Sequence, residues 1–192
     1  MVRRSVRNLV ALWATAVVLG ATTAQADPGR DFVALSLGRM TDNAWETPLS
    51  APGNIDWRDS YGVALAAGRE WPLFNWGYIG VEANLLAHWG EQDNWELAAP
   101  VYLRSLQPES WLLPGLAYGL GLSYASDVPS VEVDRKGESQ QWLAYWFIEL
   151  EFGRPSDTVR PFLRLHHRSD AFGTFEADTG SNMVFLGLRH AF

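Results

Sequence analysis

The chain has 192 residues, a formal net charge of −7 and no cysteine. Its basic residues are scattered and form no stripe, which argues against a nucleic-acid partner. Ten Trp, nine Phe and six Tyr are many for this length, and such an aromatic surplus is typical of rings placed at a membrane–water interface.

Residues 1–26 have the pattern of a secretory signal peptide. Its parts are a positive start, a short apolar run and a small-x-small site, formed by Arg3, Arg4 and Arg7, by 9–19, and by Ala24-Gln25-Ala26. We expect cleavage after Ala26, which leaves 27–192 as one mature domain. The apolar run is too short to span a bilayer as a helix, and the alternative is an uncleaved anchor. A secreted domain of this size needs no disulfide, which agrees with the absence of cysteine.

The mature chain, 27–192, contains no long apolar stretch, so a helical membrane protein is excluded. Apolar and polar residues alternate instead between turn signals, a pattern that predicts β-strands. Most of the segments exceed the roughly 5–6 residues of a globular strand and reach the about 9–11 that a tilted membrane strand needs. We expect eight strands, at 31–41, 58–70, 76–90, 95–106, 113–125, 140–153, 159–170 and 181–192.

The predicted connections alternate in length. The short ones follow strands two, four and six, at 72–75, 107–111 and 154–157. The long ones follow strands one, five and seven, at 41–57, 126–139 and 171–180, and only the short connection at 91–94 departs from the trend. Short periplasmic turns and longer external loops are typical of outer-membrane barrels. The predicted fold is therefore all-β, an eight-stranded antiparallel transmembrane β-barrel of the bacterial outer membrane.

A soluble β-sandwich or lipocalin-like barrel is the alternative fold, because its strands would alternate as well. It would not need apolar aromatic residues on one parity, nor a terminal Phe on the apolar face. In the last strand, an arginine that faced lipid at depth would be costly. The residues of the parity opposite to Arg189 are therefore expected to face lipid. This set is Val184, Leu186, Leu188, His190 and Phe192.

The polar faces of the predicted strands carry charged side chains. An eight-stranded barrel is filled by side chains, which argues against a pore for small solutes. We expect an ion-paired interior formed by Glu82, Arg104, Glu149, Glu151 and Arg164.

The seventh strand ends in Leu165-His166-His167-Arg168-Ser169. Residues i and i+2 of a strand lie on the same face, so His167 and Ser169 are expected to be neighbours on the outward face. A histidine beside a serine can act as a general base toward a nucleophile. His166 points to the opposite face, so the two histidines cannot bind one ion together. No cluster of residues has metal-ligand spacing, and neither a metal nor a cofactor is expected.

Three C-terminal stretches carry a more specific signal than the dyad alone: His167-Arg168-Ser169-Asp170-Ala171-Phe172-Gly173, Gly180-Ser181-Asn182, and Leu186-Gly187-Leu188-Arg189 with the terminal Phe192. They resemble the outer-membrane lipid A 3-O-deacylase family. The resemblance is specific over roughly the last 30 residues, and the rest of the chain agrees in architecture alone. It implies an eight-stranded barrel with a His-x-Ser dyad on its outer surface. A carboxylate on the last strand, ten residues before the C-terminal residue, completes the family's triad.

Transferred to this chain, the resemblance implies Ser169 as nucleophile and His167 as base. The third position falls on Asn182, which keeps the outward parity and lacks the carboxylate. An asparagine oxygen can still hold a histidine tautomer, as in Cys-His-Asn proteases. Glu176 and Asp178 in the preceding loop are possible substitutes for the carboxylate.

The segment after the serine also departs from the family, which typically has Asn-Ala-Gly there to supply an oxyanion hole. Here Asp170-Ala171-Phe172-Gly173 follows, and a carboxylate near a developing oxyanion is unfavourable unless it turns away. The hole would then consist of backbone N–H groups around Ala171 to Gly173.

The resemblance implies a carboxylic ester hydrolase that removes an ester-linked acyl chain from lipid A. Its partners would be lipopolysaccharide and outer-membrane lipid, and no oligomeric state is predicted. The alternative is a non-catalytic small barrel with a structural, adhesion or membrane-integrity role. Asn182 and Asp170 favour this alternative, whereas the retained His167 and Ser169 favour the enzyme.

Overall fold

The computed structural model describes residues 29–192, and the expected signal peptide at 1–26 lies outside the described residues. The chain forms eight strands: β1 (Arg30–Thr41), β2 (Trp57–Leu73), β3 (Gly77–Gly90), β4 (Trp95–Ser105), β5 (Gly115–Ala125), β6 (Trp142–Glu151), β7 (Val159–Ser169) and β8 (Gly180–Ala191). The connections hold two short helices and one 3-10 turn, which are α2 (Glu46–Ser50), α3 (Ser130–Lys136) and η1 (Pro52–Asn54).

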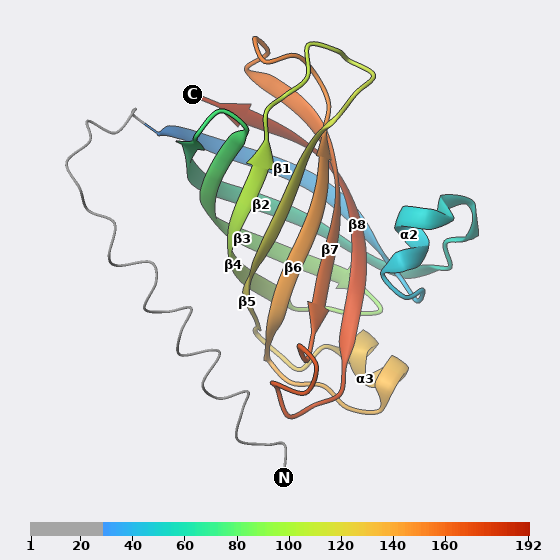
Figure 1. Cartoon of the computed structure of the whole chain (residues 1–192). Helices are drawn as coiled ribbons and strands as arrows, with labels where there is room; N and C mark the ends of the chain where they lie inside the picture. The colour runs from blue at the N-terminus through green and yellow to red at the C-terminus, as the bar shows by residue number, and fades with distance from the viewer. Residues whose placement is uncertain (1–28) are drawn as a thin grey trace, which may run out of the picture.

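Each strand pairs antiparallel with the next, and β1 pairs with β8, so one sheet closes on itself as a barrel (Figure 1). Phe192 continues the closing ladder beyond β8, because it exchanges two backbone hydrogen bonds with Asp31, at 2.9 and 3.0 Å. The predicted eight-stranded antiparallel barrel is confirmed. A single closed sheet excludes the β-sandwich alternative.

The predicted strand bounds differ from the observed ones mainly at two turns. Pro72 and Leu73 belong to β2 and pair with Tyr78 and Gly77, so the turn is shorter than predicted. Proline reads as a turn signal but is also accepted at the end of a strand. The connection between β4 and β5 is longer than predicted, because β4 ends at Ser105 and β5 begins only at Gly115. The helices within the long loops were not predicted.

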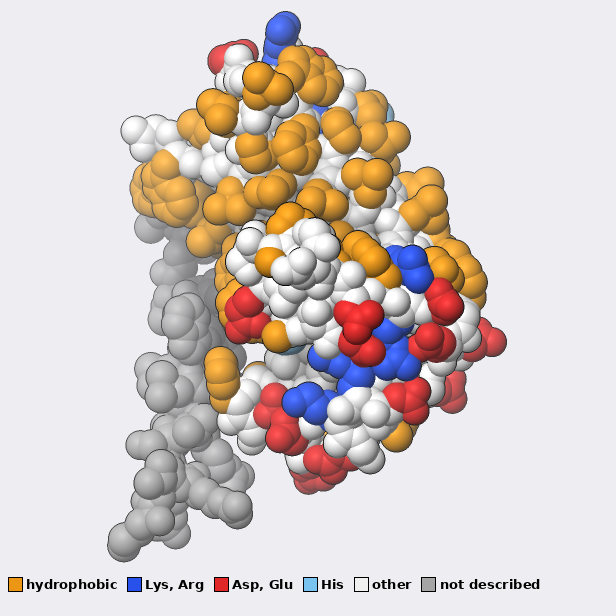
Figure 2. Space-filling view, turned by 90° about the vertical axis from the view of Figure 1, so that its right-hand side faces the viewer, with side chains coloured by type: hydrophobic (Ala, Val, Ile, Leu, Met, Phe, Trp, Pro, Cys, Tyr) orange, Lys and Arg blue, Asp and Glu red, His pale blue; other side chains and the backbone are white. Residues whose placement is uncertain are grey.

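The two faces of the sheet have opposite chemistry. Leu186, Leu188 and Phe192 are more than half exposed on the outside, whereas Phe185 and Arg189 are buried inside, which confirms the predicted parity of the last strand. Figure 2 shows hydrophobic side chains over the upper part of one face of the molecule and charged side chains gathered toward its lower end. An apolar outside and a charged inside are the arrangement of a transmembrane barrel and the reverse of a soluble one.

The predicted interior ion pairs are present. Arg104 and Arg164 both bind Glu149, at 2.7 and 2.8 Å. Arg104 also binds Glu151 at 2.9 Å, and Arg164 donates two hydrogen bonds to Glu82, at 2.5 and 2.9 Å. Buried charges persist in a protein only when they are paired in this way. These five side chains are buried and help to fill the interior of the barrel, as expected for eight strands.

The barrel has a loop end, where α3 lies, and a turn end, where the C-terminus lies (Figure 1). At the loop end α3 covers the mouth of the barrel with the buried side chains of Val131 and Glu132. Glu132 accepts hydrogen bonds from Ser181 at 2.7 Å and Ser139 at 2.5 Å, and it pairs with Arg168 at 3.2 Å. Within 29–192, no helix is long and apolar enough to cross a membrane.

The connection from β1 to β2, residues 42–56, is called the overhang below. It contains α2 and η1 and lies outside the barrel, beside the wall (Figure 1). Its base is fixed at the loop end by Arg58, which pairs with Asp42 of the overhang at 3.0 Å and with Asp134 of α3 at 3.3 Å.

Candidate active site

The alternation along β7 places His167 and Ser169 on the outer wall and their neighbours inside. His166 is buried and contacts the carboxylate of Glu96 at 3.0 Å. Arg168 is also buried in the interior. The two histidines thus lie on opposite faces of the sheet, as expected from their parity. Within 29–192, no group of three or more His, Cys, Asp or Glu side chains is arranged to hold a metal ion.

Asn182 lies directly beside His167, because the two residues are paired in the β7–β8 ladder. Asn182 Oδ1 lies 2.6 Å from His167 Nδ1. The other end of the amide, Nδ2, donates to the carbonyl oxygen of Asn43 at 2.9 Å. Because Nδ2 is held by an acceptor, Oδ1 must face the ring, and Nδ1 must carry the proton that it accepts. His167 Nε2 is then the free, basic nitrogen.

Sequence reasoning missed Asn43, which fixes both Asn182 and the overhang. Its side-chain oxygen accepts hydrogen bonds from the backbone N–H of Asp56 at 2.5 Å and from Thr41 Oγ1 at 2.8 Å. It therefore ties the two ends of the overhang together. The signal that points to it is the closure of the barrel, which pairs Thr41 at the end of β1 with Asn182 at the start of β8.

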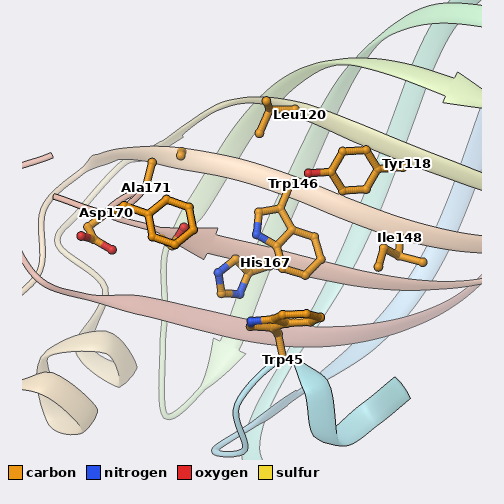
Figure 3. Close-up of a pocket in the computed structure, with 11 residues that line it drawn as sticks. Trp45, Tyr118, Leu120, Trp146, Ile148, His167, Asp170 and Ala171 are labelled. Carbon is orange, nitrogen blue, oxygen red and sulfur yellow. The ribbon is translucent and has the colours of Figure 1, made fainter. Parts of the chain in front are cut away.

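An aromatic wall surrounds His167. The ring of Trp146 lies 4.5 Å from the imidazole, between ring centres. Trp45 of the overhang meets Trp146 edge to face, with ring centres 5.4 Å apart. Figure 3 shows Trp45 and Trp146 on either side of His167. Sequence reasoning did not single out either tryptophan.

Ser169 and His167 line the same cavity, of about 560 Å³, on the outside of the barrel. Its apolar walls come from β5, β6 and the overhang, with Tyr118, Leu120 and Ile148 among the residues that line it (Figure 3). The volume is within the range of about 300–1,000 Å³ typical of ligand sites. Among the described residues, no hydrogen bond joins Ser169 to His167.

The loop after Ser169 is tightly wound. Ala171 and Phe172 have positive φ angles of 51° and 59°, a conformation that costs of the order of 1–3 kcal/mol for each non-glycine residue and that clusters at functional sites. The carboxylate of Asp170 accepts the N–H of Gly173 at 2.5 Å, so that carboxylate is engaged within its own turn. In the described part of the chain, the N–H groups of Ala171 and Phe172 make no hydrogen bond.

Glu176 and Asp178 do not contact His167 by a hydrogen bond or an ion pair. The N–H of Asp178 binds Glu138 at 3.0 Å, and Asp178 lines a smaller hollow beside the site. The hydrogen-bond partner of His167 Nδ1 is Asn182.

No protein-family model matches the sequence, and no curated protein matches it. Among solved structures, a barrel described under "De novo design of transmembrane beta-barrels" is similar, with 13% identity, a TM-score of 0.42, and coverage of 86% of this chain and 98% of that chain. The outer membrane protein OprG from Pseudomonas aeruginosa is similar with 11% identity, a TM-score of 0.37, and coverage of 88% and 98%. The barrel assignment rests on the strand pairing of this chain itself.

Proposed function

We propose that the chain is a serine esterase of the bacterial outer membrane that removes an ester-linked acyl chain from lipid A. The observation that carries the proposal is that Ser169 and His167 line one largely apolar cavity on the outer wall, while Asn182 lies behind His167 and contacts its Nδ1. A polar triad on a surface that faces hydrocarbon is useful when the substrate itself is a lipid. The loop end would face the cell exterior, where lipopolysaccharide forms the outer leaflet.

The proposed reaction begins when Ser169 Oγ attacks the ester carbonyl and His167 Nε2 takes the hydroxyl proton. The tetrahedral intermediate collapses, the ester C–O bond breaks, and His167 returns the proton to the departing sugar hydroxyl. Water then attacks the acyl-serine with His167 as base, which releases the fatty acid and restores Ser169. In an unliganded site the bond between nucleophile and base is often long and tightens when substrate binds.

Asn182 supports this chemistry through the tautomer that it selects. In serine proteases, replacing the triad carboxylate by asparagine costs about 10⁴ in kcat because the histidine adopts the wrong tautomer. Here the carbonyl of Asn43 holds the amide so that its oxygen accepts from Nδ1. The basic nitrogen therefore faces away from Asn182, although no negative charge stabilises the imidazolium.

The developing oxyanion would be held by the unpaired N–H groups of Ala171 and Phe172. Removing one donor from an oxyanion hole costs roughly 10²–10³ in kcat in a serine protease. The Asp170 carboxylate does not oppose this role, because it is bound to the Gly173 N–H.

The test is to express the full chain in a bacterial outer membrane and to analyse lipid A by mass spectrometry. We expect one acyl chain to be lost with the wild type and retained with Ser169→Ala. The matched control is Ser156→Ala, at an exposed position in a turn at the other end of the barrel, which should behave as wild type at equal membrane abundance. Intact lipid A with the wild type, or equal loss with Ser169→Ala, would overturn the proposal.

The second candidate is a non-catalytic membrane barrel. It is favoured by Asn182 in place of a carboxylate and by the lack of a hydrogen bond between Ser169 and His167. Under this function lipid A stays intact in all variants, so the same experiment separates the two.

A further inference from the structure

The overhang covers one sector of the outer wall that would otherwise face lipid. Leu165 lies on the outward face of β7 and is only 4% exposed, whereas its outward neighbours Leu163 and Leu186 are 40% and 67% exposed. The difference arises because side chains of the overhang lie over β6, β7 and β8. The overhang therefore covers the outward side chains around Leu165, whereas the outward side chains beside this sector are exposed.

A cavity of about 380 Å³ remains between the overhang and the wall. The overhang contributes Leu49 and Ile55, and the wall contributes Leu163 and Leu165. The side chains that line it are apolar, apart from the indole N–H of Trp57. A ligand with polar groups would leave them without hydrogen bonds there, at a cost of about 1–3 kcal/mol for each group.

This cavity adjoins the one that Ser169 lines. Ile148 lines both cavities. Along β7, Ser169 and His167 line the first cavity, and Leu165 and Leu163 line the second. From Ser169 to Leu163 the strand advances by about 20 Å at roughly 3.3 Å per residue. With a strand tilt of about 35–45°, this corresponds to a depth of about 15 Å, or one leaflet of a core about 30 Å thick.

We propose that the overhang cavity holds the acyl chain of the lipid whose ester lies at Ser169, and that Leu49 and Ile55 limit the length of that chain. The proposed occupant is a single acyl chain of an outer-leaflet lipid, since the cavity is largely apolar and lies on the lipid-facing wall. The limit on chain length rests on the proposed esterase function, whereas occupation of the cavity by an acyl chain does not.

The first experiment measures chain-length preference of the full-length protein in vesicles of phosphatidylethanolamine and phosphatidylglycerol. The substrates are glucosamine esters that differ only in acyl-chain length. Ile55→Trp should fill the cavity and shift the kcat/KM ratio toward short chains by about tenfold or more, since one methylene in an apolar pocket is worth 10–200-fold. Leu49→Ala should shift the ratio toward long chains. The control Leu122→Trp, on the bare wall of β5, should leave the ratio unchanged.

The second experiment needs no hydrolysis. Ser169→Ala protein is mixed in the same vesicles with an acyl glucosamine that carries a photoreactive diazirine at the end of its acyl chain, and cross-linked peptides are mapped by mass spectrometry. We expect cross-links concentrated in 48–57 and 163–165, and their loss with Ile55→Trp.

The two experiments separate the two proposals. Concentrated cross-links without hydrolysis by the wild type support the acyl-chain site and overturn the esterase. Hydrolysis with cross-links spread evenly over the barrel, and with a preference unchanged in both variants, supports the esterase and overturns the acyl-chain site. Even cross-linking without hydrolysis overturns both. If Ile55→Trp does not fold by circular dichroism, Leu49→Ala and the cross-link map of Ser169→Ala still decide the matter.

Discussion

Asn182 orients His167 through an amide oxygen, and a backbone carbonyl from the far end of the chain sets that oxygen in place. The chemistry at this position thus depends on which end of an amide faces the ring. A carboxylate has two equivalent oxygens and needs no such support, whereas an amide does. The use of an amide at this position therefore depends on the position of Asn43.

The first prediction concerns the acceptor on Asn182. Asn182→Leu removes the acceptor of the His167 Nδ1 proton, so the ring is free to adopt the other tautomer. We expect the rate of acyl release to fall by about 10³–10⁴, measured by product formation in vesicles. Asn182→Asp keeps an acceptor and adds a charge that stabilises the imidazolium, but it loses the donor to the Asn43 carbonyl, so its rate should lie well above that of Asn182→Leu. Equal losses in both variants would contradict the proposed role.

The second prediction concerns the buried charges. Glu149→Gln leaves Arg104 and Arg164 without their shared carboxylate. Breaking a buried ion pair in this way should lower the free energy of unfolding by about 3–5 kcal/mol, measured by urea titration in detergent micelles. Glu109→Gln, exposed in a connection at the turn end, is the matched control and should change it by less than about 0.5 kcal/mol. A small effect of Glu149→Gln would show that water reaches the interior.

At the scale of elements, strands were predictable from the sequence and the overhang was not. Period-two alternation identified β7 and placed His167 and Ser169 outward, and hairpin pairing brings Asn182 opposite His167. The overhang has no such period, and its contacts with Leu165 and Trp146 depend on the path of a loop over a surface. Trp45 therefore carried no recognisable signal, and Asn43 could be found only through the closure of the barrel, which pairs Thr41 with Asn182. The orientation of the Asp170 carboxylate toward the Gly173 N–H depends on local backbone geometry, so it could not be predicted from the sequence either.

The third prediction tests the closure of the overhang. Asn43→Ala removes the side-chain oxygen that accepts from the Asp56 N–H and from Thr41. One of these two hydrogen bonds is exposed and the other part-buried, and each contributes about 0.5–1.5 kcal/mol. Hydrogen exchange at the Asp42 and Asp56 amides should therefore accelerate by up to roughly 150-fold. Amides in the β3–β4 ladder provide the internal control and should keep their protection. Unchanged exchange at both amides would mean that other contacts hold the overhang.

The whole molecule combines two environments in one sheet. Within 29–192, six buried glutamates face five buried arginines inside the barrel, and Arg30 at the turn end adds a further pair with Glu70. Outside, the wall is apolar except at the His167 site and near its two ends, where Arg39 pairs with Asp59, Arg69 pairs with Asp31, and His190 is exposed. The positive and negative side chains inside the barrel nearly balance, so the interior can be filled without a large buried net charge. The fold therefore requires a surrounding solvent that accepts its apolar outside.

The last prediction tests this requirement by comparing arginine substitutions at two depths of the outer wall. Leu186 lies in the middle of β8 on the outward face, and His190 lies on the same face near the turn end. An arginine at the bilayer midplane costs about 2–4 kcal/mol, and one near the interface costs about 0–1 kcal/mol. In unfolding measured with phosphatidylcholine vesicles, Leu186→Arg should therefore be much more destabilising than His190→Arg. Both variants keep the strand pairing and the interior unchanged, so the difference reports the environment of the wall. Equally small costs at the two positions would show that this wall does not face hydrocarbon, and the membrane assignment would fail with it.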